Sequence, residues 1–147
     1  MSGNRIAPTM AITPQQELKG LLARKKELSA LIKADITDIS ADYQAGNVVP
    51  FSVLQGTDIG TRLSLGEGVE SQRIHGKYVR YHVYMEEGSV IEIHAHDCGE
   101  GIQVQSGVIR DTVTGEETRY SMYIHDGKLH RIKAIEQSVL IVDFFPF

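Results

Sequence analysis

Alternation of apolar and polar residues is the feature that most constrains how the larger part of this chain can fold. Residues 79–86 carry valine, tyrosine, valine and methionine at every second position, with more polar side chains between them. Because successive side chains of a β-strand point to opposite faces, this period of two predicts a half-buried strand. Similar short runs, separated by glycine turns, continue to a β-branched final strand at residues 138–145. The pattern predicts an antiparallel β-sandwich or barrel over residues 50–147.

Residues 1–49 follow a helical pattern instead. Thr13 and Pro14 are typical of a helix start, and Gln16 is placed to complete a capping box. Large apolar residues then recur at spacings of three, four and seven, which puts them on one helical face. They are Leu18, Leu21, Leu22, Leu28, Leu31 and Ile32. We predict that this region is an N-terminal arm and an amphipathic helix, followed by a second short amphipathic stretch at residues 36–43.

Composition excludes several classes of protein. A net charge of -4 argues against a protein that mainly binds nucleic acid, since neutralising phosphates requires clustered Lys and Arg. The single Cys98 excludes an internal disulfide and a cysteine-rich zinc site. No apolar run approaches the roughly 20 residues of a membrane span, and the first residues lack the apolar core of a signal peptide. We therefore expect a cytoplasmic protein without a membrane partner.

Two histidines and a glutamate form the most informative cluster. His94 and His96 are two residues apart, so on a strand they project from the same face. A turn after His96 would bring Glu100 back beside them on the next strand. Two imidazoles and a carboxylate on one side of an ion are the arrangement that non-haem Fe(II) sites use. His130 opens a later strand and could complete a site of three histidines and one glutamate.

This stretch resembles a known family signature. The pattern G-x5-HxH-x3-E-x6-G is the first signature of the cupin superfamily, and every fixed position is met. The matching residues are Gly88, His94, His96, Glu100 and Gly107. The resemblance covers roughly residues 60–146. It implies a mainly β chain with a cupin jelly-roll barrel (a double-stranded β-helix) at residues 50–147 and an α-helical N-terminal extension.

The second cupin signature, G-x5-P-x-G-x2-H-x3-N, is met only at Gly127 and His130. Arg119, His125 and Ala134 stand where the family has glycine, proline and asparagine. By resemblance, one divalent transition metal ion would lie in the barrel mouth, and its ligands would be His94, His96, Glu100 and His130. Imidazole and carboxylate ligands suit Fe, Mn, Ni, Zn or Cu, so the identity of the metal stays open.

Four further residues are candidates for the pocket. By the two-residue period of a strand, Glu92 would point to the same face as the two histidines. It could therefore face the cavity as a catalytic acid or base; the alternative is a surface carboxylate. His82 and Tyr84 share one face of another strand and could line the pocket, or could lie on a polar outer face. His125 is the last of these four candidates. Its place in the signature also fits a loop residue.

Function stays open between two classes, because cupins include enzymes, sensors and inert proteins. The first is a small metal-dependent enzyme, of oxygenase or isomerase/lyase type, acting on a small oxygenated ligand. The second is a non-catalytic protein: an assembly component such as a virion protein, or a cupin that senses or sequesters a ligand. The leucine face could pack on the barrel or on a second subunit. Since cupins commonly pair through N-terminal segments, we expect a homo-oligomer in which residues 1–45 supply much of the interface.

Overall fold

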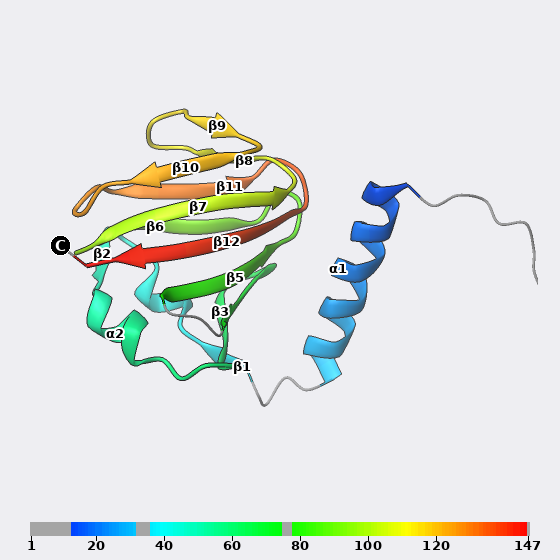
Figure 1. Cartoon of the computed structure of the whole chain (residues 1–147), viewed down its shortest axis with the longest axis horizontal. Helices are drawn as coiled ribbons and strands as arrows, with labels where there is room; N and C mark the ends of the chain where they lie inside the picture. The colour runs from blue at the N-terminus through cyan, green and yellow to red at the C-terminus, as the bar shows by residue number, and fades with distance from the viewer. Residues whose placement is uncertain (1–12, 32–35, 75–77, 147) are drawn as a thin grey trace, which may run out of the picture. The chain divides into compact units, whose positions relative to one another are not determined.

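The computed structural model describes residues 13–31, 36–74 and 78–146, which belong to two compact units. Helix α1 (Pro14–Leu31) is the described part of the first unit (Figure 1). The amide of Thr13 donates to Gln16 Oε1 at 3.0 Å, and the amide of Gln16 donates to Thr13 Oγ1 at 3.1 Å. This is the predicted capping box. The predicted arm at residues 1–12, Ile32 and the side chains of Leu28 and Leu31 lie outside the described residues.

The second unit is a barrel of two facing sheets (Figure 1). The seven-stranded sheet has the order β1-β3-β4-β5-β12-β7-β10, and the five-stranded sheet has the order β2-β6-β11-β8-β9. The strands are β1 (Ile36–Asp38), β2 (Asn47–Val49), β3 (Arg62–Gly66), β4 (Val69–Arg73), β5 (Val79–Met85), β6 (Val90–His96), β7 (Gly99–Ser106), β8 (Ile109–Asp111), β9 (Glu117–Thr118), β10 (Ser121–Ile124), β11 (His130–Ala134) and β12 (Ser138–Phe145). A 3-10 turn (Ser40–Asp42) and helix α2 (Phe51–Gly56) join the first strands. The mainly β prediction is confirmed.

Residues 36–49 correct the sequence analysis. The predicted amphipathic stretch at residues 36–43 contains β1 and the 3-10 turn rather than a helix. Strand β1 pairs in parallel with β3, and β2 pairs in parallel with β6. The boundary predicted at residue 50 therefore falls inside the barrel unit. Three-residue strands carry almost no local signal, because they are stable only when they pair with a sheet edge.

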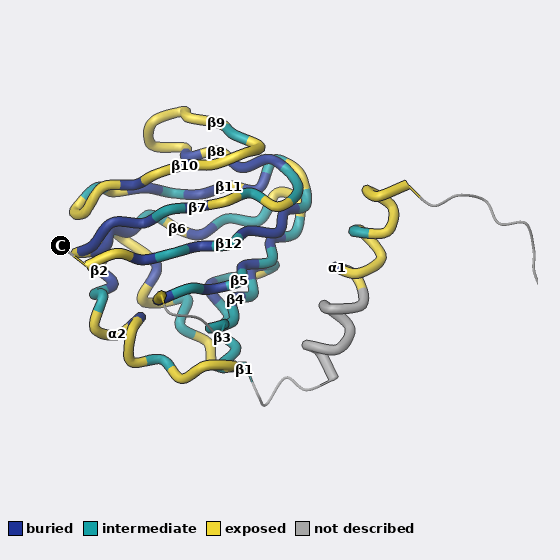
Figure 2. The backbone as a smooth tube through the Cα atoms, in the orientation of Figure 1, coloured by how far each residue is buried: buried dark blue, intermediate teal, exposed yellow. Residues whose placement is uncertain are grey.

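The core lies between the two sheets, and buried residues, dark blue in Figure 2, recur along the strands of both sheets. Strand β5 alternates buried and half-buried residues along its whole length, as its sequence predicts. Tyr81 and Met85 on this strand are 2% and 0% exposed, and Leu140 on β12 is 1% exposed. The inner faces are therefore closely packed and apolar, which leaves little space inside the barrel. Among the described residues, no helix has the length and apolarity needed to cross a membrane.

Candidate metal centre

Four side chains from three strands converge inside the barrel. His94 and His96 lie on β6, Glu100 on β7 and His130 at the start of β11. His94 and His130 face each other in the pairing of β6 with β11. One ligand atom from each of the four residues lies within 4.8 Å of the others. All four are at most 6% exposed, so the predicted convergence is confirmed.

Backbone carbonyls fix the orientation of all three imidazoles. In each ring, Nδ1 lies within hydrogen-bonding distance of a carbonyl oxygen, which can only accept. The pairs are His94 with Glu92 at 2.6 Å, His96 with Val49 at 2.8 Å and His130 with Lys128 at 2.9 Å. Nδ1 therefore carries the hydrogen in each neutral ring, and Nε2 presents its lone pair. This is how proteins commonly orient metal-binding histidines.

The atoms that face the centre have no hydrogen-bond partner. His96 Nε2, His130 Nε2 and Glu100 Oε1 are all buried and unpartnered. The Glu100 oxygen lies 3.4 Å from His96 Nε2 and 3.1 Å from His130 Nε2, close enough for ion pairing. Buried polar atoms without partners are rare in native proteins. Ligand atoms on opposite sides of one ion lie roughly 4.2 Å apart, so shifts of a few tenths of an ångström would let all four residues share a metal.

Burial and mutual charge control the pKa values of the cluster. Burial, assisted by the charge of His130, lowers the pKa of His94 to about 3, and burial also lowers the pKa of His96. Burial alone would raise the pKa of Glu100, but the charges of the three histidines hold it at about 2. For His130, burial acts downward, but the nearby Glu100 carboxylate outweighs it and raises the pKa. The cluster thus presents an ionised carboxylate and at least two neutral imidazoles at neutral pH.

Metal-free protein should lose stability as the pH falls from about 6.5 towards 3. His94 titrates at 6.5 in the unfolded chain and at about 3 in the barrel, and His96 shifts in the same direction, so unfolding takes up protons in this range. His94 lowers the free energy of unfolding by up to about 1.4 kcal/mol per pH unit in this range, and His96 acts in the same direction. The raised pKa of His130 has the opposite effect on the pH dependence of stability. The stability that His130 contributes is fully present below pH 6.5, and it is lost only as the pH rises through the folded-state pKa. Urea unfolding of chelator-treated protein at pH 4.5, 5.5 and 6.5 measures the slope.

The control for this measurement is His125→Ala, because His125 is exposed and outside the cluster. This variant should keep the slope of the parent protein. Equal free energies of unfolding at the three pH values would contradict the prediction.

Known proteins resemble this chain in structure and not detectably in sequence. No protein-family model and no curated protein match it. An RmlC-like cupin from Shewanella frigidimarina superimposes with a TM-score of 0.51 at 18% identity, covering 63% of this chain and 86% of that one. KdgF from a Halomonas species gives 0.51 at 17% identity, covering 63% and 91%. A protein described as a predicted oxalate decarboxylase, from Thermotoga maritima, gives 0.50 at 16% identity, covering 60% and 93%.

The barrel has the cupin fold. The fold class implied by the signature at residues 88–107 is thereby confirmed, and identities below 20% extend the likeness no further than the fold.

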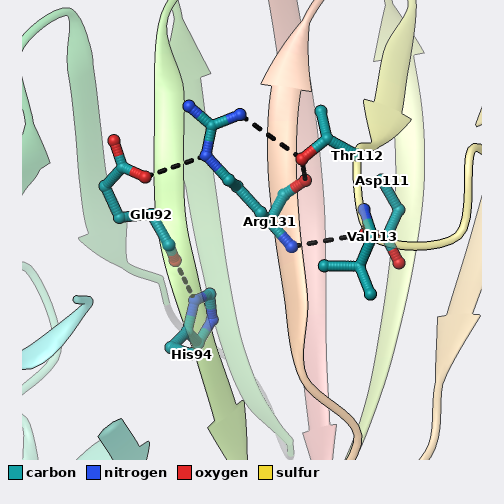
Figure 3. A network of polar contacts seen from close by, with 6 residues as sticks. All are labelled: Glu92, His94, Asp111, Thr112, Val113 and Arg131. Atoms are coloured by element: carbon teal, nitrogen blue, oxygen red, sulfur yellow. Dashed lines mark hydrogen bonds and ion pairs between the residues drawn. The ribbon is translucent and has the colours of Figure 1, made fainter. Parts of the chain in front are cut away.

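Glu92 does not face the cavity of the cupin barrel, so its predicted placement is wrong. Ile132 on β11 pairs with Ile91, whereas His130 pairs with His94, so three steps along β6 match two along β11. This irregularity shifts the alternation and turns Glu92 to the outer face. Its carboxylate is exposed and binds the guanidinium of Arg131 at 2.9 Å (Figure 3). Only its backbone carbonyl, which accepts from His94, contributes to the site.

The three other pocket candidates also lie outside the cavity. His82 and Tyr84 are on the outer face of β5, where Tyr84 Oη lies 3.5 Å from His82 Nδ1. His125 is exposed, and its ring packs 5.0 Å from that of Tyr123. On β5 the polar face is the solvent face, because the opposite face of this strand packs into the apolar core.

Tyr43 lies beside the cluster and escaped the sequence analysis. Its buried ring packs edge-on against His94 at 4.6 Å, and burial, followed by the charge of Glu100, raises the pKa of its phenol. On another side of the cluster, Phe144 packs 4.8 Å from the ring of His96. Both aromatic rings help to line an internal cavity of about 30 Å³ that reaches three of the four clustered residues.

Proposed function

We propose that the cupin barrel binds one divalent transition metal ion through His94, His96, Glu100 and His130, and that it is a metal-dependent enzyme of oxygenase or isomerase/lyase type. The observation that carries the proposal is the set of three buried, unpartnered atoms that face one point. In the described part of the chain these atoms approach one another, with Glu100 Oε1 3.4 Å and 3.1 Å from the two Nε2 atoms, but none has a hydrogen-bond partner, and a metal ion would satisfy all three at once. Carbonyl-bound Nδ1 atoms hold the imidazoles ready for this role.

The four residues would fill only part of the coordination sphere of the ion and leave positions open on the cavity side. A bound metal of this kind holds a small oxygenated ligand and polarises it as a Lewis acid. The four residues would hold the ion in place, and the apolar cavity wall would exclude bulk water from it. Fe, Mn, Ni, Zn and Cu all accept this donor set.

Metal analysis of protein purified without a histidine tag tests the proposal. We expect close to one transition metal ion per chain, and we expect chelation to lower the melting temperature and the same ion to restore it, because a ligand that binds only the native state stabilises it. Substoichiometric metal, with no thermal shift after addition of any of the five ions, would contradict the proposal. A ligand screen on the metal-loaded form would then define the substrate.

The N-terminal helix supports a second proposal, that the protein forms a homo-oligomer. Helix α1 belongs to a unit separate from the barrel; on its predicted apolar face Leu21 is 60% exposed and Leu18 is half-buried, whereas Leu22 is only 6% exposed. Burying a leucine contributes roughly 1.5–3 kcal/mol, so an apolar helical face favours a partner surface. Because residues 36–49 contribute β1, β2 and Tyr43 to the barrel, the informative truncation removes residues 1–31 rather than 1–45.

We expect light scattering to show that the full-length protein is at least a dimer. The truncated barrel should form an assembly of fewer subunits and should retain its β-rich circular dichroism spectrum. A monomeric full-length protein, or a truncated barrel with an unchanged oligomeric state, would disprove the role of the helix.

A further inference from the structure

Apart from three hydroxyl-bearing residues, the described residues that line the cavity outside the metal cluster are apolar. Most of its lining residues are leucine, isoleucine, valine and phenylalanine from both sheets. Among the residues that the structure describes, no lysine or arginine lines it. A charged group of a ligand that lay away from the metal would therefore be buried without a counter-ion, which is strongly unfavourable. The cavity chemistry disfavours ligands with a second charged group.

The size of the cavity restricts the ligand further. Its volume is about 30 Å³, far below that of an ordinary small-molecule pocket. Most of the wall residues belong to paired strands, and Ile132 and Leu140 among them are each 1% exposed. Closely packed core residues of this kind cannot move aside without a loss of contacts. The available space therefore fits a ligand of only a few non-hydrogen atoms.

Three lining residues carry a hydroxyl group, and these groups differ in whether they are free to donate a hydrogen bond to a ligand. Tyr81 is committed, because its hydroxyl donates to the carbonyl of Leu54 at 2.7 Å. Ser71 lies on β4, in the sheet opposite the strand that carries His94 and His96. Tyr43 packs against both histidines, with ring centroids 4.6 Å and 6.1 Å apart. Within the described ranges, no hydrogen bond joins the Tyr43 hydroxyl to another residue of the protein.

The backbone holds Tyr43 in this place. Its amide donates to Ser40 at 3.1 Å, and the amide of Gly46 donates to Ile93 on β6 at 3.0 Å. Between them, Ala45 has a φ of 54°, a left-handed conformation that is uncommon for a residue with a Cβ. Such strain persists where the surrounding structure enforces it, often at ligand sites. The loop is thus anchored to the strand that carries the clustered histidines.

We propose that the cavity admits a ligand of only a few non-hydrogen atoms, with at most one charge, to the free side of the metal, and that the Tyr43 hydroxyl donates a hydrogen bond to it. The inference rests on the proposed metal site and adds the class of ligand and the residue that anchors it. Tyr43 packs directly against both clustered histidines of β6, whereas Ser71 lies on a strand of the opposite sheet.

Cobalt-loaded protein tests this inference with azide as the probe. Azide is small and singly charged, and its binding changes the visible absorption of Co²⁺. We compare the parent protein with Tyr43→Phe and with the matched control Tyr81→Phe, which removes a hydroxyl already bonded to Leu54. All three should hold one Co²⁺ per chain. Tyr43→Phe should weaken azide binding about 3- to 10-fold, the effect of one hydrogen bond, and Tyr81→Phe should change it less than about twofold.

The possible failures are distinct. Unchanged azide affinity in fully loaded Tyr43→Phe would overturn the role of Tyr43, and so would a loss of cobalt from this variant alone. Binding of the larger, doubly charged oxalate ion at concentrations that saturate with azide would overturn the limits on size and charge. A parent protein that holds no Co²⁺ would refute the proposed metal site itself, and metal analysis would reveal this before any azide is added.

Discussion

His96→Ala should remove most of the bound metal while leaving the cupin barrel folded. The imidazole of His96 is 2% exposed, and its Nδ1 is held by the carbonyl of Val49 on β2 at 2.8 Å. Changes in the outer partners of metal ligands typically cost 10- to 100-fold in affinity. Loss of a ligand itself should therefore weaken metal binding by more than about 100-fold. Competition with a chromogenic chelator measures the affinity.

The matched control is His125→Ala, which removes an exposed histidine from the same barrel. Its metal affinity should equal that of the parent protein. Circular dichroism must show that both variants retain the β-sheet spectrum, because His96 also packs 4.8 Å from Phe144 and its removal leaves a gap there. Undiminished metal content in folded His96→Ala would remove the cluster from consideration as a metal site.

The four clustered residues could be predicted because their arrangement depends mainly on local geometry. His94 and His96 share a face through the two-residue period of a strand, and the following turn returns Glu100 to them. His130 was a candidate because it opens a later strand, and the second cupin signature supported it, but its place beside the others depends on the pairing of β11 with β6. The alternation on β5 similarly revealed its buried face without knowledge of its neighbours.

Glu92 could not be placed from the sequence, because the irregularity that turns it outward arises from pairing. Nothing within β6 marks the extra residue; only the register of Ile91 and His94 against β11 reveals it. Counting in twos from His94 therefore predicted the wrong face for Glu92. The same counting succeeded between His94 and His96, where the pairing with β2 is regular.

Tyr43 was missed for a related reason. It lies 51 residues before His94 in the sequence, and no spacing rule connects the two. Its position depends on β2, a three-residue strand that exists only because it pairs with β6. Contacts that depend on such short, paired segments cannot be derived from periodicity.

Gly107→Ala should cost more than about 3 kcal/mol of folding free energy and is expected to leave the protein largely insoluble. Gly107 has a φ of 93°, in the left-handed region that a residue with a Cβ adopts only at a cost of roughly 1–2 kcal/mol. An added Cβ would also overlap Ser138 Oγ and the carbonyl oxygen of Gln137. Ser138 is fully buried, and its hydroxyl donates to Glu136 at 2.7 Å, so this neighbour cannot retreat.

Gly88→Ala is the matched control for this prediction. Gly88 is the other glycine of the cupin signature and also has a positive φ, of 80°, but an added Cβ there would meet no atom within 4 Å. It should therefore carry only the backbone cost, about 1–2 kcal/mol, and remain soluble. Urea unfolding and the soluble yield of both variants measure the difference, which isolates the overlap at Ser138 from the strain that both glycines relieve. If Gly107→Ala proves as stable as Gly88→Ala, close packing at the turn between β7 and β8 is not what requires glycine there.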